Sequence, residues 1–257
     1  MGDREPIIRI MNINKSSKKR LICGVIPARY ESVRFPGKPL ALICGKPMIQ
    51  YVYERCQRAV MLDQLIVATD DTRIYDTVTV FGGNAVMTSA RHASGTDRIA
   101  EAVQAMDCDL VINIQGDEPL IDPSIIDGLA SMMLNDSSIV MATPIVQGSS
   151  EDERDNPNIV KVVCDKNGFA LYFSRSVIPF VRDKEPEKWY KHIGLYGYKK
   201  NFLVQFVKLP QSYLERAEKL EQLRALENGY RIKTLVTDYD GMGVDTPADL
   251  EEVEKRL

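Results

Sequence analysis

Three basic side chains, Arg29, Arg34 and Lys38, lie close together in a stretch rich in proline and glycine. An apolar run at residues 21–26 precedes them and an amphipathic pattern at residues 47–60 comes after them, which predicts a strand, an irregular loop and a helix. In a nucleotide-binding sheet, phosphates bind beyond the carboxyl end of such a strand. Three cations on a loop stiffened by proline suit a triphosphate. Neither a Walker A nor a GxGxxG pattern is present, so a solvated basic loop stays open as the alternative.

Two aspartates, Asp117 and Asp245, stand where the edge of a sheet is predicted. The apolar run at residues 110–115 favours a central parallel strand, and Asp117 follows it after a glycine that permits close approach of a ligand. Asp245 stands just outside a terminal helix for which Thr246 and Asp249 predict a capping box. Carboxylate oxygens suit a hard cation. We therefore expect a metal or substrate site that uses both aspartates.

A turn at Ser94, Gly95 and Thr96 offers hydroxyl and backbone N–H groups at the start of a predicted helix, with Arg98 one turn inside it. One interpretation is that Thr96 caps the helix. The other is that the turn selects a base or holds a phosphate, and the two are compatible. For the polar cluster at residues 69–71, capping of the next helix is favoured over contact with a ligand.

The regular alternation of strands and helices weakens in the second half of the chain. Strands at residues 158–164 and 169–173, joined by a turn at residues 165–168, predict a hairpin. The polar stretch at residues 148–158 predicts a loop. Residues 182–189 carry the only tryptophan and predict an exposed loop or an arm that contacts a partner.

Two later segments carry polar groups suited to a pocket. Residues 192–198 alternate as a strand does, with His192 and Tyr196 on one side, and both a pocket-lining and a structural role stay open for the histidine. Residues 215–228 predict one helix that ends at Gly229. Its polar residues, which would ordinarily form a solvated face, are Glu221, Gln222 and Arg224.

The composition of the whole chain suits one α/β domain with a modest insertion, since 257 residues include 44% hydrophobic and 27% charged residues. A net charge of −3 gives no sign of general nucleic-acid binding, and no apolar run approaches the roughly 20 residues that span a bilayer. Five cysteines without a CxxC pair predict reduced core thiols, and two histidines argue against a zinc site. Residues 1–20 lack packable periodicity and a secretory apolar segment, and predict a flexible extension.

A set of motifs from residue 21 to the C-terminus resembles the CMP-KDO synthetases, the 3-deoxy-manno-octulosonate (KDO) cytidylyltransferases. The motifs, specific only as a set, are IPARYESVRFPGKPL, ATDD, SGTDR, NIQGDEPLI, ALYFSR, HIGLYGY, KLEQLRALENG and GVDTP. The first is shared in general form with other sugar nucleotidyltransferases, whereas QGDEP, HIGLYGY and LEQLR point to this branch.

The resemblance implies a cytoplasmic, Mg²⁺-dependent transferase that makes CMP-KDO and pyrophosphate from CTP and KDO for lipopolysaccharide synthesis. It also implies a homodimer. The implied fold is α/β and nucleotidyltransferase-like, related to the Rossmann fold, with a mostly parallel central sheet, helices on both faces and a smaller inserted β-hairpin region. We expect residues 21–257 to form a single domain, in which residues from about 145 to 200 form an inserted region for sugar binding and dimerisation.

By motif, the resemblance also assigns roles to single residues. Asp117 and Asp245 are similar to the family's metal carboxylates, and Arg29 and Lys38 join them as catalytic residues. The implied nucleotide site contains Pro27, Ala28, Arg29, Arg34, Lys38, Ser94, Gly95 and Arg98. The implied sugar site contains Gln115, Arg175, His192, Tyr196, Glu221 and Gln222.

Two alternatives remain at this point. One is a cytidylyltransferase for a related acidic sugar, 8-amino-KDO or a sialic acid. The other is a non-catalytic nucleotide-binding protein on the same fold. Asp117 and Asp245 argue against the second alternative, because a protein that only binds a nucleotide has no physical need for both carboxylates at the sheet edge.

Overall fold

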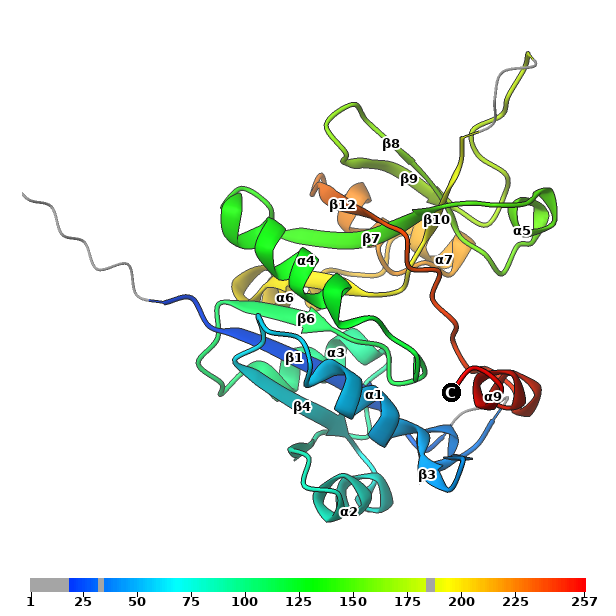
Figure 1. Cartoon of the computed structure of the whole chain (residues 1–257). Helices are drawn as coiled ribbons and strands as arrows, with labels where there is room; N and C mark the ends of the chain where they lie inside the picture. Colours follow the sequence, from blue (N-terminus) through cyan, green and yellow to red (C-terminus); the bar gives the residue numbers. More distant parts are fainter. Residues whose placement is uncertain (1–18, 32–34, 184–187) are drawn as a thin grey trace, which may run out of the picture.

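A computed structural model describes residues 19–31, 35–183 and 188–257, which form an α/β fold around one large sheet (Figure 1). The first half of this sheet has the order β5-β4-β1-β6, and its three pairings are parallel. Its strands are β1 (Ile22–Ala28), β4 (Gln64–Thr69), β5 (Ala85–Met87) and β6 (Leu110–Asn113). The predicted parallel core is confirmed. Arg34 and most of the predicted N-terminal extension lie outside the described residues.

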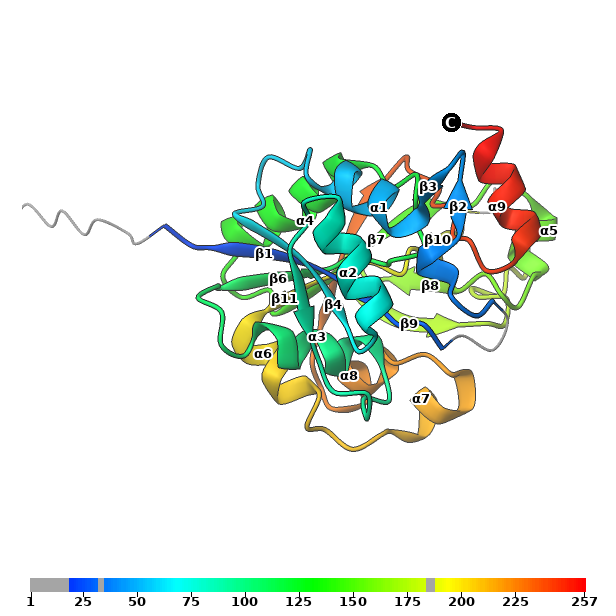
Figure 2. The same cartoon turned by 90° about the horizontal axis from the view of Figure 1, so that it is seen from below.

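Helices cover both faces of the sheet (Figure 2), which explains why its central strands are apolar along most of their length. One face is covered by α1 (Met48–Cys56), α2 (Thr72–Val80) and α4 (Pro123–Asn135). The other is covered by α3 (Gly95–Val103), α6 (Lys200–Phe206) and α8 (Leu223–Glu227). Alternate residues of β1 enter the two cores: Ile22 and Ile26 pack on the first face, and Cys23 and Val25 on the second.

The second half of the sheet is mixed. It contains β7 (Met141–Gln147), β8 (Lys161–Cys164), β9 (Ala170–Ser174), β10 (Tyr190–His192), β11 (Tyr196–Lys199) and β12 (Ile232–Thr237). β12 runs parallel to β7, whereas β8, β9, β10 and β11 pair antiparallel. The predicted hairpin is confirmed as β8 and β9, with Gly168 at φ 71° in the turn between them.

Two loop predictions in this half need correction. The stretch at residues 148–158 contains a short helix, α5 (Glu151–Asp155), because the Ser150 side chain accepts a hydrogen bond from the backbone N–H of Glu153 and caps it. Trp189, in the predicted exposed arm, is 5% exposed and packs against Gly148, where any Cβ would collide with the indole ring. The arm is therefore anchored at its end.

The predicted strand at residues 192–198 is divided into β10 and β11 by a bulge. Both strands lie along the same side of β7. His192 and Gly197 are five residues apart, whereas their partners on β7, Ile145 and Ala142, are three residues apart. Two extra residues are accommodated between them, and a bulge of this kind redirects the neighbouring side chains.

The predicted helix at residues 215–228 is wrong as one element. It is divided into α7 (Tyr213–Glu218) and α8, because Lys219 adopts a left-handed conformation with φ 55°. The break turns the next polar residues inward, so Gln222 is 4% and Arg224 is 5% exposed. Arg224 is held by a buried ion pair in which its Nε lies 2.8 Å from Oε2 of Glu215.

The C-terminal segment packs against the first loop. The 3₁₀ turn η1 (Lys38–Leu40) and the small hairpin of β2 (Leu42–Ile43) and β3 (Lys46–Pro47) lie beside α9 (Pro247–Glu254) (Figure 1). Ile43, Val244 and Val253 share a small apolar cluster. The predicted capping box of Thr246 and Asp249 is confirmed. Among the described helices, none combines the length and the apolar character needed to cross a membrane.

Candidate active site

A cavity of about 310 Å³ lies at the carboxyl ends of β1 and β6. It brings together ten residues that the sequence analysis assigned to a site: Pro27, Ala28, Arg29, Lys38, Ser94, Gly95, Arg98, Gln115, Asp117 and Asp245. The remaining lining residues are Pro39, His92, Ala93 and Gly116. This location is where open α/β sheets bind nucleotides, beyond the carboxyl ends of parallel strands.

Lys38 lies between the two predicted metal carboxylates. Its Nζ is 2.6 Å from Oδ2 of Asp117 and 3.4 Å from Oδ1 of Asp245. The lysine side chain is 14% exposed, so the ammonium group is largely withdrawn from bulk water. One positive group thus contacts two carboxylates that are far apart in sequence, and the carboxylates face the same small volume.

Backbone contacts hold Asp245 near Asp117. The N–H of Val244 donates to the carbonyl oxygen of Asp117 at 2.8 Å, which ties the segment before α9 to the loop after β6. A second tie joins the same two segments, because the Tyr239 hydroxyl donates to Oε2 of Glu118 at 3.2 Å. The position of the second carboxylate is therefore fixed by long-range hydrogen bonds.

Glu118 is a buried carboxyl group that the sequence analysis did not single out. It is 8% exposed, and burial together with the neighbouring charge of Asp117 raises its pKa to about 7, against the hydrogen bond from Tyr239. Its position directly after Asp117 could have drawn attention to Glu118. The sequence does not show, however, which of two adjacent acidic residues faces the interior.

Gly116 allows the ends of β1 and β6 to approach closely. A Cβ at Gly116 would lie 2.9 Å from the carbonyl oxygen of Pro27, so any larger residue would push these two strand ends apart. Pro27 and Asp117, on either side of this contact, line the same cavity.

The start of α3 forms another wall of the cavity. Ser94, not Thr96, is the N-cap, and its side chain accepts from the backbone N–H of Asp97 in a capping box. Thr96 donates its hydroxyl to Glu221, which the break before α8 turns toward this helix start. Burial raises the pKa of Glu221, while its hydrogen bonds with Thr96 and Ser94 oppose that shift.

Arg98 lines the cavity but is also held by the protein. Its Nη1 donates to the Thr88 hydroxyl and its Nη2 to Oδ2 of Asp70, both at 2.6 Å. The neighbouring Asp71 caps α2, as expected for the polar cluster at residues 69–71. Asp70 therefore fixes the orientation of a guanidinium group at the cavity wall.

The residues assigned to the sugar fall into two groups. Gln115 lines the cavity and donates from Nε2 to the carbonyl oxygen of Gly194 at 2.7 Å. The others do not line that cavity: Arg175, His192, Tyr196, Glu221 and Gln222. His192 and Tyr196 lie together, with ring centroids 5.4 Å apart, and Glu221 acts on Tyr196 through its charge.

Burial controls the ionisation of this second group. It lowers the pKa of His192 to about 3 and raises the pKa of Tyr196, so the imidazole and the phenol are both neutral near pH 7. Arg175 is held by backbone carbonyls, from Nε to Glu218 at 2.7 Å and from Nη1 to Pro157 at 2.9 Å. Nε2 of Gln222 is buried without a hydrogen-bond partner among the described residues.

The donor set at the cavity fits only certain metals. In the part of the chain that the structure describes, no three or more His, Cys, Asp or Glu side chains converge as metal ligands. Asp117 and Asp245 are two carboxylates, and Mg²⁺ characteristically binds through one or two carboxylates with water and substrate phosphates as the other ligands. The pair therefore suits Mg²⁺ carried with a nucleotide rather than an all-protein metal site.

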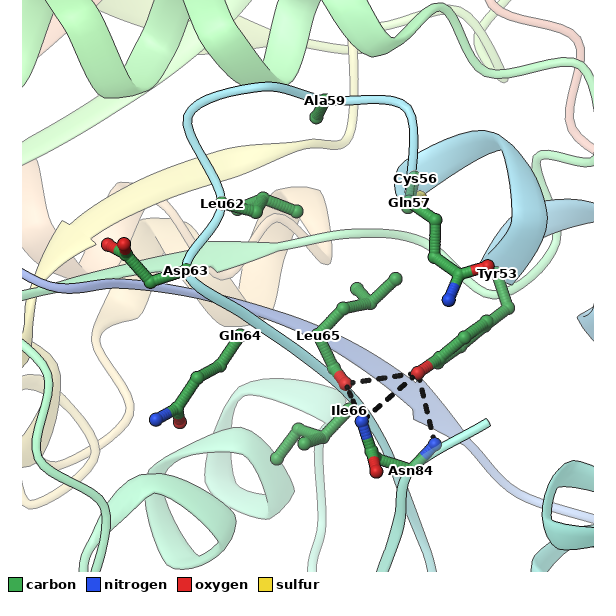
Figure 3. A pocket seen from close by; sticks show the side chains of 10 residues that line it. All are labelled: Tyr53, Cys56, Gln57, Ala59, Leu62, Asp63, Gln64, Leu65, Ile66 and Asn84. Carbon is green, nitrogen blue, oxygen red and sulfur yellow. Dashed lines mark hydrogen bonds between the residues drawn. The ribbon is translucent and has the colours of Figure 1, made fainter. Parts of the chain in front are cut away.

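A larger and more open cavity of about 470 Å³ lies beside α1 and β4 (Figure 3). Its polar groups already bond to one another: the Tyr53 hydroxyl accepts from the backbone N–H of Asn84 at 3.0 Å and lies 3.3 Å from the carbonyl oxygen of Leu65. None of the residues predicted for a site lines this cavity.

Comparisons with known proteins show what this chain is similar to. Residues 23–233 match the family described as Cytidylyltransferase. Two proteins described as 3-deoxy-manno-octulosonate cytidylyltransferase are similar to this chain, at 52% identity for that of Geotalea daltonii and 55% for that of Thermodesulfovibrio yellowstonii. These matches cover 92% of this chain and 98% and 97% of the two relatives.

Solved structures extend the likeness. A structure described as CMP:2-keto-3-deoxy-manno-octonic acid synthetase complexed with CTP superimposes with a TM-score of 0.88 at 44% identity, over 92% of this chain and 98% of that one. A cytidylyltransferase from Leptospira borgpetersenii has a TM-score of 0.63 at 17% identity, over 92% of this chain and 86% of that one, and shares the fold.

Proposed function

The chain belongs to the cytidylyltransferase family, among the 3-deoxy-manno-octulosonate cytidylyltransferases, and on that premise we propose how it works. The enzyme transfers the cytidylyl group of CTP to KDO, which gives CMP-KDO and pyrophosphate for lipopolysaccharide biosynthesis. The observation that carries the site assignment is the convergence of Asp117 and Asp245 on Lys38 within the cavity at the sheet edge.

In the reaction the anomeric hydroxyl of KDO attacks the α-phosphorus of CTP in line, the new C–O–P linkage forms, and pyrophosphate leaves. The main demands are to bring two anions together and to neutralise charge on the leaving group. Arg29 lines the cavity and offers a planar fork of donors to phosphate oxygens. Lys38 contributes a compact positive charge for the β- and γ-phosphates.

Asp117 and Asp245 would hold Mg²⁺, because they supply two oxygen ligands and leave the remaining positions to phosphate and water. When bound, the metal supplies charge neutralisation on the triphosphate and activation of the attacking hydroxyl. The ammonium of Lys38 already contacts both carboxylates, so binding of the nucleotide with its metal requires that Lys38 exchange these contacts for phosphate oxygens. We assign no protein side chain as general base.

Ser94, Gly95 and Arg98 form the wall of the nucleotide site, and the start of α3 presents backbone N–H groups there. The sugar is bound by Gln115 together with the group of Arg175, His192, Tyr196, Glu221 and Gln222. Two contacts join this group to the cavity: Gln115 reaches the bulge after His192, and Glu221 reaches the start of α3.

We further propose that the enzyme is a cytoplasmic homodimer. Exposed apolar side chains on the second half of the sheet support an interface there, since Leu171 on β9 is 61% and Val236 on β12 is 62% exposed. All five cysteines are described and none forms a disulfide, which suits a reducing compartment. Light scattering on the purified protein tests the dimer: a mass of one chain at micromolar concentration would overturn it.

The deciding assay for the activity is release of pyrophosphate from CTP with KDO, with and without Mg²⁺. We expect release only when CTP, KDO and the metal are all present. A panel with 8-amino-KDO and a sialic acid tests sugar choice, and faster turnover with either would assign the enzyme to that sugar. Binding of CTP without turnover on any sugar would support a non-catalytic protein.

A further inference from the structure

Thr143 is a buried residue of β7 to which no role has been assigned. It is 0% exposed, and its hydroxyl lies beneath the bulge that separates β10 from β11. Three acceptor or donor atoms surround the hydroxyl: the carbonyl oxygen of Leu195 at 2.8 Å, the carbonyl oxygen of Ile193 at 3.1 Å, and Nε2 of His192 at 3.0 Å.

Counting protons resolves this arrangement. A threonine hydroxyl donates one hydrogen bond and accepts up to two, whereas a carbonyl oxygen only accepts. The carbonyl of Ile193 already accepts from the backbone N–H of Leu195 at 2.8 Å. Donation to Nε2 of His192 would leave both carbonyl oxygens facing a hydroxyl oxygen with no proton between them, at 2.8 and 3.1 Å. The hydroxyl proton therefore goes to the shorter carbonyl contact, that of Leu195, and the Thr143 oxygen is left to accept from His192.

We propose that Thr143 is a positioning residue that holds His192 as its neutral Nε2–H tautomer, so that Nδ1 accepts a hydrogen bond from a hydroxyl group of the sugar. The proposal rests on the assignment of His192 to the sugar site made above. It adds the polarity of that contact: a bare Nδ1 repels a carboxylate and attracts a hydroxyl group.

The surroundings of His192 agree with this polarity. The imidazole lies against the rings of Phe173 and Tyr196, at 5.1 and 5.4 Å between centroids, and no carboxylate contacts it among the described residues. Burial lowers the pKa of His192 to about 3, so the ring carries no charge near pH 7. Among the described residues Nδ1 has no hydrogen-bond partner, and His192 is only partly buried, so Nδ1 is left to accept a bond from a ligand.

The bulge connects this histidine to the nucleotide cavity. Thr143 donates to the carbonyl of Leu195, and the preceding carbonyl, that of Gly194, accepts from Gln115, which lines the cavity. Two successive carbonyls are thus held by two side chains. Thr143 in this way sets both the proton on His192 and the position of the loop that separates it from Tyr196.

The first test measures the tautomer directly, in the free protein and without substrates. The chain has only two histidines, so His92→Gln leaves His192 as the single imidazole in a ¹⁵N-histidine spectrum. We expect a protonated Nε2 and a bare Nδ1 at pH 7. A protonated Nδ1, or a charged ring, would overturn the proposal whatever the activity of the enzyme.

The second test compares Thr143→Val with Thr143→Ser. Valine removes the hydroxyl at similar volume, and serine retains it. We expect Thr143→Val to mix the two tautomers and to raise KM for KDO about 3- to 10-fold, the effect of one neutral hydrogen bond, with KM for CTP changed by less than about 2-fold. Thr143→Ser should restore both values.

Equal increases of both KM values, or serine behaving as valine does, would show a purely structural role and reject the proposal. If Thr143→Val does not fold by circular dichroism, the spectrum of the His92→Gln protein still decides the tautomer. Activity of the wild-type enzyme with CTP and KDO tests the proposed function separately, so the two can fail independently.

Discussion

The backbone N–H of Val244 donates to the carbonyl oxygen of Asp117 at 2.8 Å and so joins two segments that are more than a hundred residues apart in sequence. Each partner lies next to or within the pair of carboxylates at the cavity. Because the bond uses backbone atoms, the Asp117 and Asp245 side chains can be changed without removing it. Mutagenesis can therefore test their charges separately from the fold.

Asp117→Asn and Asp245→Asn should each leave the fold intact and lower kcat by about 10²-fold or more, because a neutral amide is a poor ligand for Mg²⁺ and screens less charge. The measurement is pyrophosphate release over a range of Mg²⁺ concentrations. Asp136→Asn, on the surface and bonded to Ser138, is the matched control and should retain full activity. Near-normal turnover in either aspartate variant would refute the metal assignment.

Lys38→Ala should raise KM for CTP about 10-fold, since a single ammonium contact to phosphate is lost from a partly buried site. It also leaves Asp117 and Asp245 without their common positive partner, so the dependence of the rate on Mg²⁺ concentration should become steeper. Steady-state kinetics in CTP at several metal concentrations measure both effects. Lys46→Ala, which breaks a nearby pair with Glu54 outside the cavity, controls for the loss of one lysine. Unchanged kinetics in CTP would remove Lys38 from the site.

Gly116→Ala should lower kcat/KM at least about 10-fold and also lower Tm, because the added Cβ would lie 2.9 Å from the carbonyl oxygen of Pro27 and force the ends of β1 and β6 apart. Gly243→Ala is the matched control, since a Cβ there meets no atom within 4 Å. Thermal unfolding and kinetics measured on both variants test this. Equal behaviour of the two would mean that the close approach at Gly116 has no importance.

Acidification should destabilise the protein partly through His192. Its pKa is about 3 in the folded protein, against an ordinary value of 6.5, so between these values the unfolded chain binds more protons. The stabilising contribution is therefore complete above pH 6.5 and is lost as pH falls toward 3. Between pH 7 and 5 the loss is about 2 kcal/mol, which urea unfolding at both pH values measures. His192→Gln should show a correspondingly smaller difference, and an identical one would contradict the buried neutral state.

Much of the cavity can be predicted from sequence because its residues come directly after strand ends. Strands are recognised by their apolar runs, and parallel packing brings the residues after each strand to one edge of the sheet. Arg29, Gln115 and Asp117 are predicted in this way. Asp245 is predicted because the capping box after it defines where the helix begins. Local patterns are sufficient for these positions.

The rest depends on contacts that no local pattern contains. A helical period continues through Lys219, so the sequence does not predict the left-handed break there, which turns Glu221 and Gln222 inward. The alternation at residues 192–198 likewise conceals the bulge, because the extra residues are visible only against the register of β7. Tertiary partners decide both outcomes.

The late position of Asp245 in the sequence also has a consequence for the protein during its synthesis. A nascent chain that has emerged as far as β12 already contains every strand of the large sheet, yet it lacks one of the two acids that face Lys38. On the proposed mechanism, a chain that has not been translated past residue 245 lacks one of its two metal ligands and so cannot transfer the nucleotide of CTP.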